Sequence, residues 1–303
     1  MKKIIVTGAS GFIGRHSLKP LIERGFEVHA VTSRLSSSVI DGCIWHRANL
    51  LDYSQIESLM QSIQPSHLLH FAWYVIPGKC WQAKENFLWV QASLELIRRF
   101  QEYGGQRLVI AGTCAEYDWK YGYCSELVTP RHPNSAYGIC KNGLQEMISF
   151  YSGLTGLSSA WGWIFWLYGP HEYPNRLVSS VICSILKEEP ARCSHGNQIR
   201  DFLCVQDVAE AFVALLESEV TGTVNIASGQ PIAIKEVVTK IAAIIGSPDL
   251  IKLGAIPPAP NDQPLLVADV GRLSNEVGWC PKFNLDKGLE QTIAWWENHL
   301  AES

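Results

Sequence analysis

Three features that mark other classes of protein are missing from this chain of 303 residues. No apolar run reaches the ~20 residues that a membrane-spanning helix needs. There is no long basic run, and the formal net charge of −4 does not indicate a nucleic-acid or anionic-membrane surface. The apolar stretch after Lys2 and Lys3 is too short for a signal peptide and lacks a cleavage site, so we expect a cytoplasmic protein.

The spacings typical of metal or redox sites are also absent from the nine cysteines, none of which form a C-x-x-C pair. An odd number cannot pair completely within one chain, so we expect reduced thiols. Cys193 and His195 lie two residues apart without further ligands nearby, and no metal site is predicted. The eleven tryptophans are an unusual number, and we interpret most of them as core or pocket residues.

A glycine turn near the start of the chain is the most informative motif present. An apolar run at residues 4–6 leads into it, and a helical pattern follows. In such a turn, backbone N–H groups approach a pyrophosphate at the helix N-terminus, and a Cβ would obstruct that approach. We therefore predict a dinucleotide site, with contacts from Gly8, Ser10, Gly11, Phe12, Ile13 and Gly14.

Apolar runs and helical patterns then alternate along the first half of the chain. Repeated units of this kind predict an α/β fold, a doubly wound parallel Rossmann sheet with helices on both faces. Strands covered on both faces are continuously apolar, as these runs are. Strands are expected at 4–6, 27–32, 44–47, 67–72, 107–111 and 158–166, and helices at 17–24, 53–64, 86–103 and 136–152.

The alternation of strand and helix patterns changes after Tyr168-Gly169-Pro170, where the expected loops are longer and prolines cluster. We interpret the change as a smaller α/β lobe interleaved with the first, and we expect it to bind substrate. The predicted division gives the Rossmann dinucleotide-binding domain residues 1–168 and 200–226, and the smaller lobe residues 169–199 and 227–303.

A Tyr-x-x-x-Lys pair, Tyr137 and Lys141, lies near the start of the predicted helix 136–152. The spacing places both side chains on one helix face. An ammonium beside a phenol lowers a pKa that is about 10 in isolation, so the tyrosine can exchange a proton near neutral pH. Thr113 follows an apolar strand and can hold the same substrate oxygen. We predict that Thr113, Tyr137 and Lys141 are catalytic.

Together these motifs resemble the extended short-chain dehydrogenase/reductases, and more narrowly the nucleotide-sugar epimerase/dehydratase family. The resemblance implies a nicotinamide cofactor on the first lobe and a nucleotide-diphosphate sugar under the second. It implies that Tyr137 is the acid/base, that Lys141 holds the nicotinamide ribose and that Thr113 orients the reacting oxygen. Further family landmarks follow in order: Tyr168-Gly169-Pro170, Arg200-Asp201-Phe202, Asp207-Val208-Ala209, and Gly278-Trp279 before Pro281.

The resemblance also implies substrate contacts beyond Thr113. Arg200 matches a family arginine that meets the diphosphate, whose oxygens suit a forked guanidinium. Its alternative role is a surface salt bridge with Asp201. Asn175 and Arg176 lie where the family contacts substrate, and alternatively they only cap a helix.

The cofactor preference depends on the end of the second strand. An acidic residue there usually binds the adenosine ribose of NAD, whereas here Ser33 and Arg34 follow Thr32. A hydroxyl and an arginine suit the 2′-phosphate of NADP, and Arg15 adds a second charge. We expect NADP(H), with NAD(H) as the alternative if Arg34 is only a solvated loop residue.

Four more residues are predicted to line the cofactor. Asn49 and Leu50 stand where the family commonly has an aspartate and an aliphatic residue near adenine, and asparagine can still hydrogen-bond the base. Phe71 and Ala72 come at the end of the fourth strand, where ligands of such sheets bind.

The residues after Thr113 bear on the reaction. Family dehydratases tend to carry Asp-Glu there, and Cys114 and Ala115 argue against a 4,6-dehydratase. The epimerase-reductases that make GDP-fucose place a cysteine where Ala115 stands, so we interpret Cys114 as a packing residue. A 4-keto-reductase and a 4-epimerase would use one set of residues, but an epimerase usually uses NAD.

The expected preference for NADP therefore favours NADPH-dependent reduction of a nucleotide-linked 4-keto-6-deoxy sugar, with Tyr137 as the proton donor. The alternatives are an NAD-dependent 4-epimerase and a non-catalytic NAD(P)-binding sensor or scaffold.

Some positions depart from the family or stay open. The strand before Tyr168 often carries an arginine and an asparagine in the family, where this chain has Trp163 and Trp166. We therefore expect substrate binding either to differ from the family or to depend on Arg200. A homodimer through the helices 86–103 and 136–152 is expected by analogy. Apolar residues that either form that seam or face the sheet are Leu94, Ile97, Leu144, Met147 and Ile148. Aromatic residues that either stack on substrate or pack a loop are Trp119, Tyr121 and Tyr123.

Overall fold

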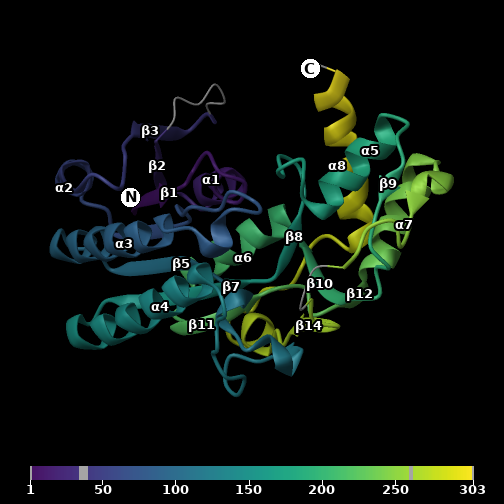
Figure 1. The fold of residues 1–303 in the computed structure, drawn as a ribbon. Coiled ribbons are helices and arrows are strands. Elements are labelled where there is room, and N and C mark those ends of the chain that lie inside the picture. Colours follow the sequence, from purple (N-terminus) through teal and green to yellow (C-terminus); the bar gives the residue numbers. More distant parts are fainter. Residues whose placement is uncertain (1, 34–39, 259–261, 302–303) are drawn as a thin grey trace.

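The larger of two main sheets has seven strands, all parallel, in the order β11-β7-β5-β4-β1-β2-β3 (Figure 1). This computed structural model describes residues 2–33, 40–258 and 262–301. The order reverses between β1 and β4, the switch point where open α/β sheets bind ligands. The strands are β1 (Lys3–Thr7), β2 (Glu27–Thr32), β3 (Cys43–Arg47), β4 (His67–His70), β5 (Arg107–Thr113), β7 (Ser158–Ile164) and β11 (Gly222–Ile226).

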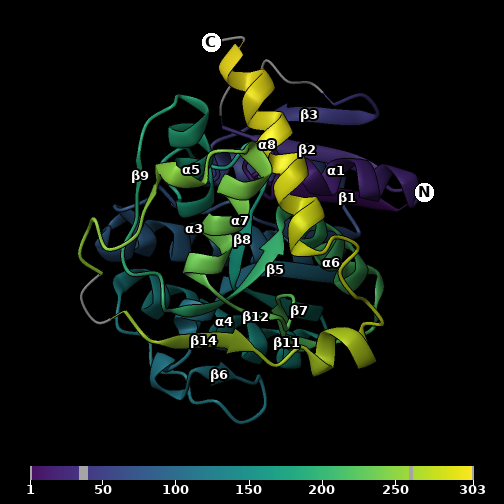
Figure 2. The ribbon, with the colours of Figure 1, turned by 90° about the vertical axis from the view of Figure 1, so that its right-hand side faces the viewer.

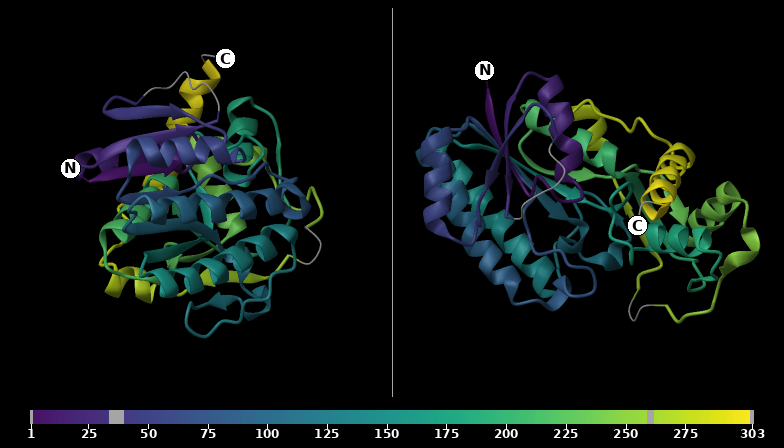
Figure 3. Two further views of the ribbon diagram at one scale, coloured as in Figure 1. Left: turned by 90° about the vertical axis from the view of Figure 1, so that its left-hand side faces the viewer. Right: turned by 90° about the horizontal axis from the view of Figure 1, so that it is seen from above.

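Helices cover both faces of this sheet, which confirms the doubly wound α/β prediction. On one face, α2 (Tyr53–Ile63), α3 (Glu85–Glu102) and α4 (Ala136–Thr155) lie side by side (Figure 3). On the other face, α1 (Gly14–Glu23) packs beside α6 (Val205–Glu217). Each layer encloses its own apolar core, so the central strands are apolar on both sides.

The smaller lobe carries the second sheet and the helices α5 (Leu177–Leu186), α7 (Ile234–Ile245) and α8 (Leu285–Ala301), which enclose a third core (Figure 2). Its sheet has the order β12-β10-β14-β6, with β8 beside β10. These strands are β6 (Tyr123–Cys124), β8 (Trp166–Tyr168), β10 (Ile199–Cys204), β12 (Pro231–Ala233) and β14 (Leu265–Ala268), and a separate pair is β9 (Ala191–Arg192) with β13 (Ile251–Lys252).

Short helices complete the chain: η1 (Cys80–Gln82), η2 (Cys114–Glu116), η3 (Trp119–Tyr121), η4 (Pro248–Leu250) and the π-helical turn η5 (Arg272–Glu276). The division into 1–168 with 200–226 and 169–199 with 227–303 stays a prediction. Sheet membership crosses it, because β6, β8 and β10 pair in the smaller sheet.

One predicted strand was wrong as a single element. The apolar run 158–166 breaks at Phe165, so that β7 pairs with β5 and β11 while β8 pairs with β10. A continuous apolar run does not reveal where a chain leaves one buried sheet for another, because both segments are buried. Thr113 also lies within β5 rather than beyond it.

Asp201 ties the smaller sheet together. Its fully buried carboxylate accepts the N–H of Ser228 (2.8 Å), Gly229 (3.0 Å) and Ala268 (3.3 Å), and also the Ser228 hydroxyl. It therefore links β10 to β14 and to the turn before β12.

We expect Asp201→Ala to lower the free energy of unfolding by about 3 kcal/mol, because several buried N–H groups lose their acceptor. Urea denaturation followed by tryptophan fluorescence measures the change. The control is Asp249→Ala, at an exposed position, which should change stability by less than about 0.5 kcal/mol. A loss at Asp201 as small as the control's would contradict this role.

Candidate active site

The glycine turn between β1 and α1 is packed at main-chain distance. Gly11 N–H donates to Gly8 O (2.8 Å), and a Cβ on Gly14 would lie 2.2 Å from that same oxygen. Gly8 has a φ of +65°, and a Cβ there would lie 2.9 Å from Ala72 N. The chain thus forms a cradle that side chains would fill, at the N-terminus of a helix. These residues fit a dinucleotide pyrophosphate.

The other predicted cofactor residues lie around this turn. Phe71 and Ala72 leave β4 against Gly8, with Phe71 N–H donating to Thr7 O (3.2 Å) and Ala72 N–H to Thr7 Oγ1 (3.2 Å). Phe12 and Ile13 are partly buried within the turn. Two more predicted residues follow β3. The Leu50 side chain is buried in the core, whereas Asn49 is exposed and its Oδ1 accepts the Leu51 N–H (3.1 Å).

The end of β2 carries hydroxyls. Ser10 Oγ and Thr32 Oγ1 are 2.8 Å apart, and Ser33 is exposed just beyond. Arg34 lies outside the described residues. Arg15 donates to Ser10 O (2.9 Å). Sequence reasoning missed Arg47, an exposed residue at the end of β3 that pairs in register with Thr32.

The predicted catalytic residues come together at the other side of the switch point. Thr113 ends β5, and its side chain lies close enough to the Tyr137 phenol to lower the pKa of that phenol. Lys141 Nζ donates to Ala111 O (2.8 Å), on the same strand. Ser135 starts α4 by accepting Gly138 N–H (3.1 Å), which fixes the first turn that carries Tyr137.

Within the chain itself, the electrostatics differ from the expected lowering of the phenol pKa by lysine. Burial raises the pKa of Tyr137 and outweighs the Thr113 hydrogen bond, which lowers it. Burial also lowers the pKa of Lys141 to about 7, against the Glu116 carboxyl, which raises it. The ammonium lies 3.8 Å from the Trp73 ring centroid, a close cation–π contact.

Arg200 is buried, and its partner is Asp262 rather than the predicted alternative, Asp201. Asp201 is occupied by the backbone of the smaller sheet. The Arg200 guanidinium also donates to Ile199 O (2.8 Å) and lies 4.9 Å from the Trp166 ring centroid. The alternative of a surface salt bridge was therefore wrong.

Arg176 and Asn175 are exposed at the start of α5. Arg176 occupies the N-cap position but makes no side-chain capping bond, so the capping alternative was wrong for it. Its charge lowers the pKa of the Cys80 thiol, against burial, which raises it.

An aromatic strip, defined as Trp81, Trp119 and Trp166, runs from Tyr137 to Arg200. The Trp81 ring meets Tyr137 edge-on (centroids 5.8 Å apart) and Trp119 likewise (6.2 Å). Trp119 then contacts Trp166 (6.3 Å), which lies under the guanidinium of Arg200. Trp81 was missed because no motif marks it; Trp119 was left open between stacking and packing.

Other predicted aromatic residues lie elsewhere. Trp163 is fully buried against Tyr117 (centroids 4.4 Å apart) and does not belong to the strip. Tyr121 ends η3 and Tyr123 starts β6, and both side chains are exposed. Cys114 is buried, and burial raises the pKa of its thiol. All nine cysteines, each within the described part of the chain, are free.

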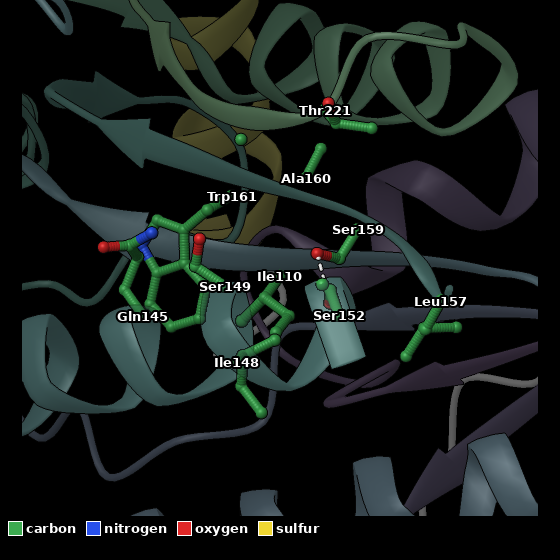
Figure 4. A pocket seen from close by; sticks show the side chains of 12 residues that line it. Ile110, Gln145, Ile148, Ser149, Ser152, Leu157, Ser159, Ala160, Trp161 and Thr221 are labelled. Carbon is green, nitrogen blue, oxygen red and sulfur yellow. Dashed lines mark hydrogen bonds between the residues drawn. The ribbon is translucent and has the colours of Figure 1, made fainter. Parts of the chain in front are cut away.

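A cavity of about 320 Å³ lies away from these residues, between α4 and the strands β5, β7 and β11 (Figure 4). It is lined by Ser149, Ser152 and Trp161 among others, and Ser152 Oγ and Ser159 Oγ are 2.8 Å apart on its wall. No predicted catalytic or cofactor residue lines it. Across residues 2–33, 40–258 and 262–301, no helix has the length and apolarity to cross a bilayer, and no three His, Cys, Asp or Glu residues are grouped as metal ligands.

Comparison with known proteins gives the family. The model of the NAD dependent epimerase/dehydratase family matches residues 4–227. A dTDP-glucose 4,6-dehydratase from Xanthomonas campestris pv. campestris is 26% identical, over 96% of this chain and 92% of that protein. A dTDP-6-deoxy-L-talose 4-dehydrogenase (NAD(+)) from Aggregatibacter actinomycetemcomitans is 28% identical, over 79% of this chain and 89% of that protein.

Among solved structures, the UDP-glucose 4-epimerase of Thermus thermophilus in complex with NAD superposes with a TM-score of 0.83. It is 26% identical, and the match covers 97% of this chain and 98% of that one. The resemblance stated from the sequence is confirmed by these matches.

We expect Gly14→Ala to weaken binding of the nicotinamide dinucleotide at least tenfold and to lower the melting temperature, because the new methyl would lie 2.2 Å from Gly8 O. Quenching of tryptophan fluorescence by added NADH or NADPH measures the affinity. Gly153→Ala is the control, since no atom lies within 4 Å of the position that its methyl would take and alanine favours a helix. Equal affinity in the Gly14 variant would argue against this turn as the cofactor cradle.

Proposed function

Because the chain belongs to the NAD-dependent epimerase/dehydratase family, we propose that it reduces a nucleotide-linked 4-keto-6-deoxy sugar with NADPH. It is an enzyme of the sugar-nucleotide epimerase/dehydratase class. The second candidate is an NAD-dependent 4-epimerase.

The observation that carries the proposal is a complete catalytic trio without the acidic pair of the dehydratases. Thr113, Tyr137 and Lys141 converge, while the two residues after Thr113 are the buried Cys114 and Ala115. The nearby Glu116 is fully buried: its Oε1 accepts the Thr113 N–H and the Trp161 indole N–H, and its Oε2 has no hydrogen-bond partner among the described residues. With no exposed carboxyl there to eliminate water, the site suits exchange between a carbonyl and an alcohol.

The chain's own residues would act as follows. Thr113 and Tyr137 hold the keto oxygen of the sugar, and Tyr137 donates the proton that this oxygen takes up. Lys141, whose ammonium is fixed on Ala111 O, stabilises the phenolate that remains. NADPH, held through its pyrophosphate by the glycine turn, would supply the hydride that converts the C4 ketone into a secondary alcohol.

The aromatic strip supports a deoxy sugar. Trp81, Trp119 and Trp166 separate the acid/base from Arg200, which we assign to the diphosphate together with Asn175 and Arg176. The sugar would then lie along indole faces, which favour C–H surfaces and a methyl group over hydroxyls. The name of the Aggregatibacter relative likewise describes a 6-deoxy sugar and a dehydrogenation at carbon 4.

The preference for NADP rests on charges at the end of β2. Within the described residues, Ser10, Thr32 and Ser33 offer hydroxyls there, and Arg47 stands in register beside Thr32. Guanidinium and hydroxyl groups suit a 2′-phosphate, whereas no carboxylate follows Thr32 to bind a free ribose. NAD is the alternative, since the Thermus thermophilus relative is described as its complex with NAD.

We expect the purified enzyme to oxidise NADPH when given a nucleotide-linked 4-keto-6-deoxy sugar, followed by absorbance at the reduced-nicotinamide band. Tyr137→Phe should lower kcat by roughly 10²–10⁴-fold, because it removes the proton donor. Its affinity for NADPH should stay within about threefold. Interconversion of two nucleotide-sugar epimers without net NADPH consumption would favour the epimerase, and NADPH binding without any turnover would favour the sensor or scaffold.

We also infer a homodimer through α3 and α4, but not through all of the predicted residues. Ile97, Leu144 and Ile148 are buried against the sheet, and Leu94 packs partly on the same core, so only Met147 is well exposed. The exposed apolar side chains that support a seam are Ile139, Met147, Phe150 and Leu154 on α4, with Phe87 and Leu88 on α3.

The double variant Phe150→Glu/Leu154→Glu should therefore be a monomer, since it places charges where side chains 72% and 71% exposed would meet a second copy. Light scattering coupled to size exclusion gives the mass. Leu253→Glu, an exposed leucine of the smaller lobe, should leave the dimer intact. A monomeric wild-type protein would refute the dimer.

A further inference from the structure

Glu116 is a fully buried carboxyl beside the catalytic trio that the proposed reaction does not use. It is 0% exposed and ends η2, the turn that follows Thr113. Burying a carboxyl is costly unless the structure makes specific use of it. Its bonds show what that use is.

The carboxylate and Thr113 hold each other in a reciprocal cap. Glu116 Oε1 accepts the Thr113 N–H (2.9 Å), and Thr113 Oγ1 accepts the Ala115 N–H (3.2 Å). The second bond occupies one lone pair of the threonine oxygen. The hydroxyl proton and the remaining lone pair are thereby directed to the Tyr137 phenol and the substrate oxygen.

A glycine and a tryptophan complete the pocket that holds Glu116. Glu116 Oε1 also accepts the Trp161 Nε1–H (3.0 Å). A Cβ on Gly112 would lie 2.0 Å from that Nε1 and 2.8 Å from Oε1, so the strand has no room there for a side chain. The indole and the carboxylate therefore pack directly on the main chain of β5.

The Trp161 indole links the same carboxyl to the catalytic lysine: its Nε1–H donates to Glu116 Oε1, and Lys141 Nζ lies 5.7 Å from its ring centroid. Burial lowers the pKa of Lys141 and raises that of Glu116 to about 7, and the charge of each partner opposes the shift of the other. The other titratable groups around Lys141 are His70 of β4 and Tyr137 of α4. Burial holds the pKa of His70 at about 3, so it is neutral and carries no counter-charge. Cys114, a buried thiol, is neutral as well.

We propose that Glu116 is a positioning residue that fixes the Thr113 hydroxyl and serves as the counter-charge of the Lys141 ammonium. The proposal rests on the proposed function, because it assigns Thr113 and Lys141 the roles given there. With this role, the residues that build the site at the end of β5 form the continuous segment Gly112-Thr113-Cys114-Ala115-Glu116.

The test is Glu116→Gln, which keeps the shape and an Oε1 acceptor for both N–H donors but removes the charge. The Glu116 charge raises the pKa of both Lys141 and Tyr137. Both must be protonated when Tyr137 donates, so their loss with rising pH sets the alkaline limb of kcat. We expect that limb to move at least one pH unit lower in Glu116→Gln, with kcat near the wild-type value at acidic pH.

A second readout does not need turnover. The lysine carbons of ¹³C-lysine-labelled protein, with Lys141 assigned by its loss in Lys141→Arg, report the pKa of Lys141 directly in the free protein. That pKa should fall by at least one unit in Glu116→Gln. In Glu116→Asp, which keeps the charge, it should stay within about 0.3 units.

Glu126→Gln is the matched control, since Glu126 is another buried carboxyl that accepts a backbone N–H, from Asn225 (2.7 Å). It should leave the Lys141 pKa and the pH profile unmoved. An unchanged Lys141 pKa in Glu116→Gln, or an equal fall in Glu116→Asp, would overturn the proposal. Absence of turnover in the wild-type enzyme would instead refute the proposed function, and the resonance measurement would still decide the role of Glu116.

Discussion

The close approach of α4 to the end of β5 is the constraint on which the candidate site depends. A Cβ on Gly138 would lie 2.5 Å from Ala115 O, so the helix meets the turn after β5 at main-chain distance. Only at that separation can Lys141 reach Ala111 O and Tyr137 reach the Thr113 hydroxyl. Two glycines, Gly112 in the strand and Gly138 in the helix, therefore matter as much to the chemistry as the residues that carry it.

That closeness has an electrostatic consequence. The ammonium of Lys141 is buried and the Tyr137 side chain is partly buried between a strand and a helix, and burial opposes the charged form of each. Groups around Lys141 stabilise its charged form: the Ala111 carbonyl, the face of Trp73 and the carboxyl of Glu116. The catalytic pair is thus tuned by its surroundings rather than by its own spacing alone.

The sequence predicted the larger sheet well, because each βα unit carries its own local signals. It could not predict that residues 158–166 serve two sheets, because an apolar run records burial and not the partner strand. Thr113, Tyr137 and Lys141 were found because a fixed spacing and a known strand end identify them. Trp81 and Glu116 were not, since their roles arise from contacts between segments that no local pattern encodes. Arg34 lies outside the described residues, so its contact with the 2′-phosphate of NADP stays a prediction.

Arg200 lies in the smaller sheet with its counter-ion beside it. Its guanidinium is buried against Trp166 and paired with Asp262, so its charge is already balanced within the chain. A diphosphate carries more charge than one carboxylate and offers more oxygens to a forked donor. If Arg200 binds the diphosphate as proposed, the diphosphate must compete with Asp262, which penalises ligands with a single negative charge. Selectivity for a nucleotide-diphosphate sugar would then depend on Asp262 as much as on Arg200. The aromatic strip would discriminate among the sugars of such ligands.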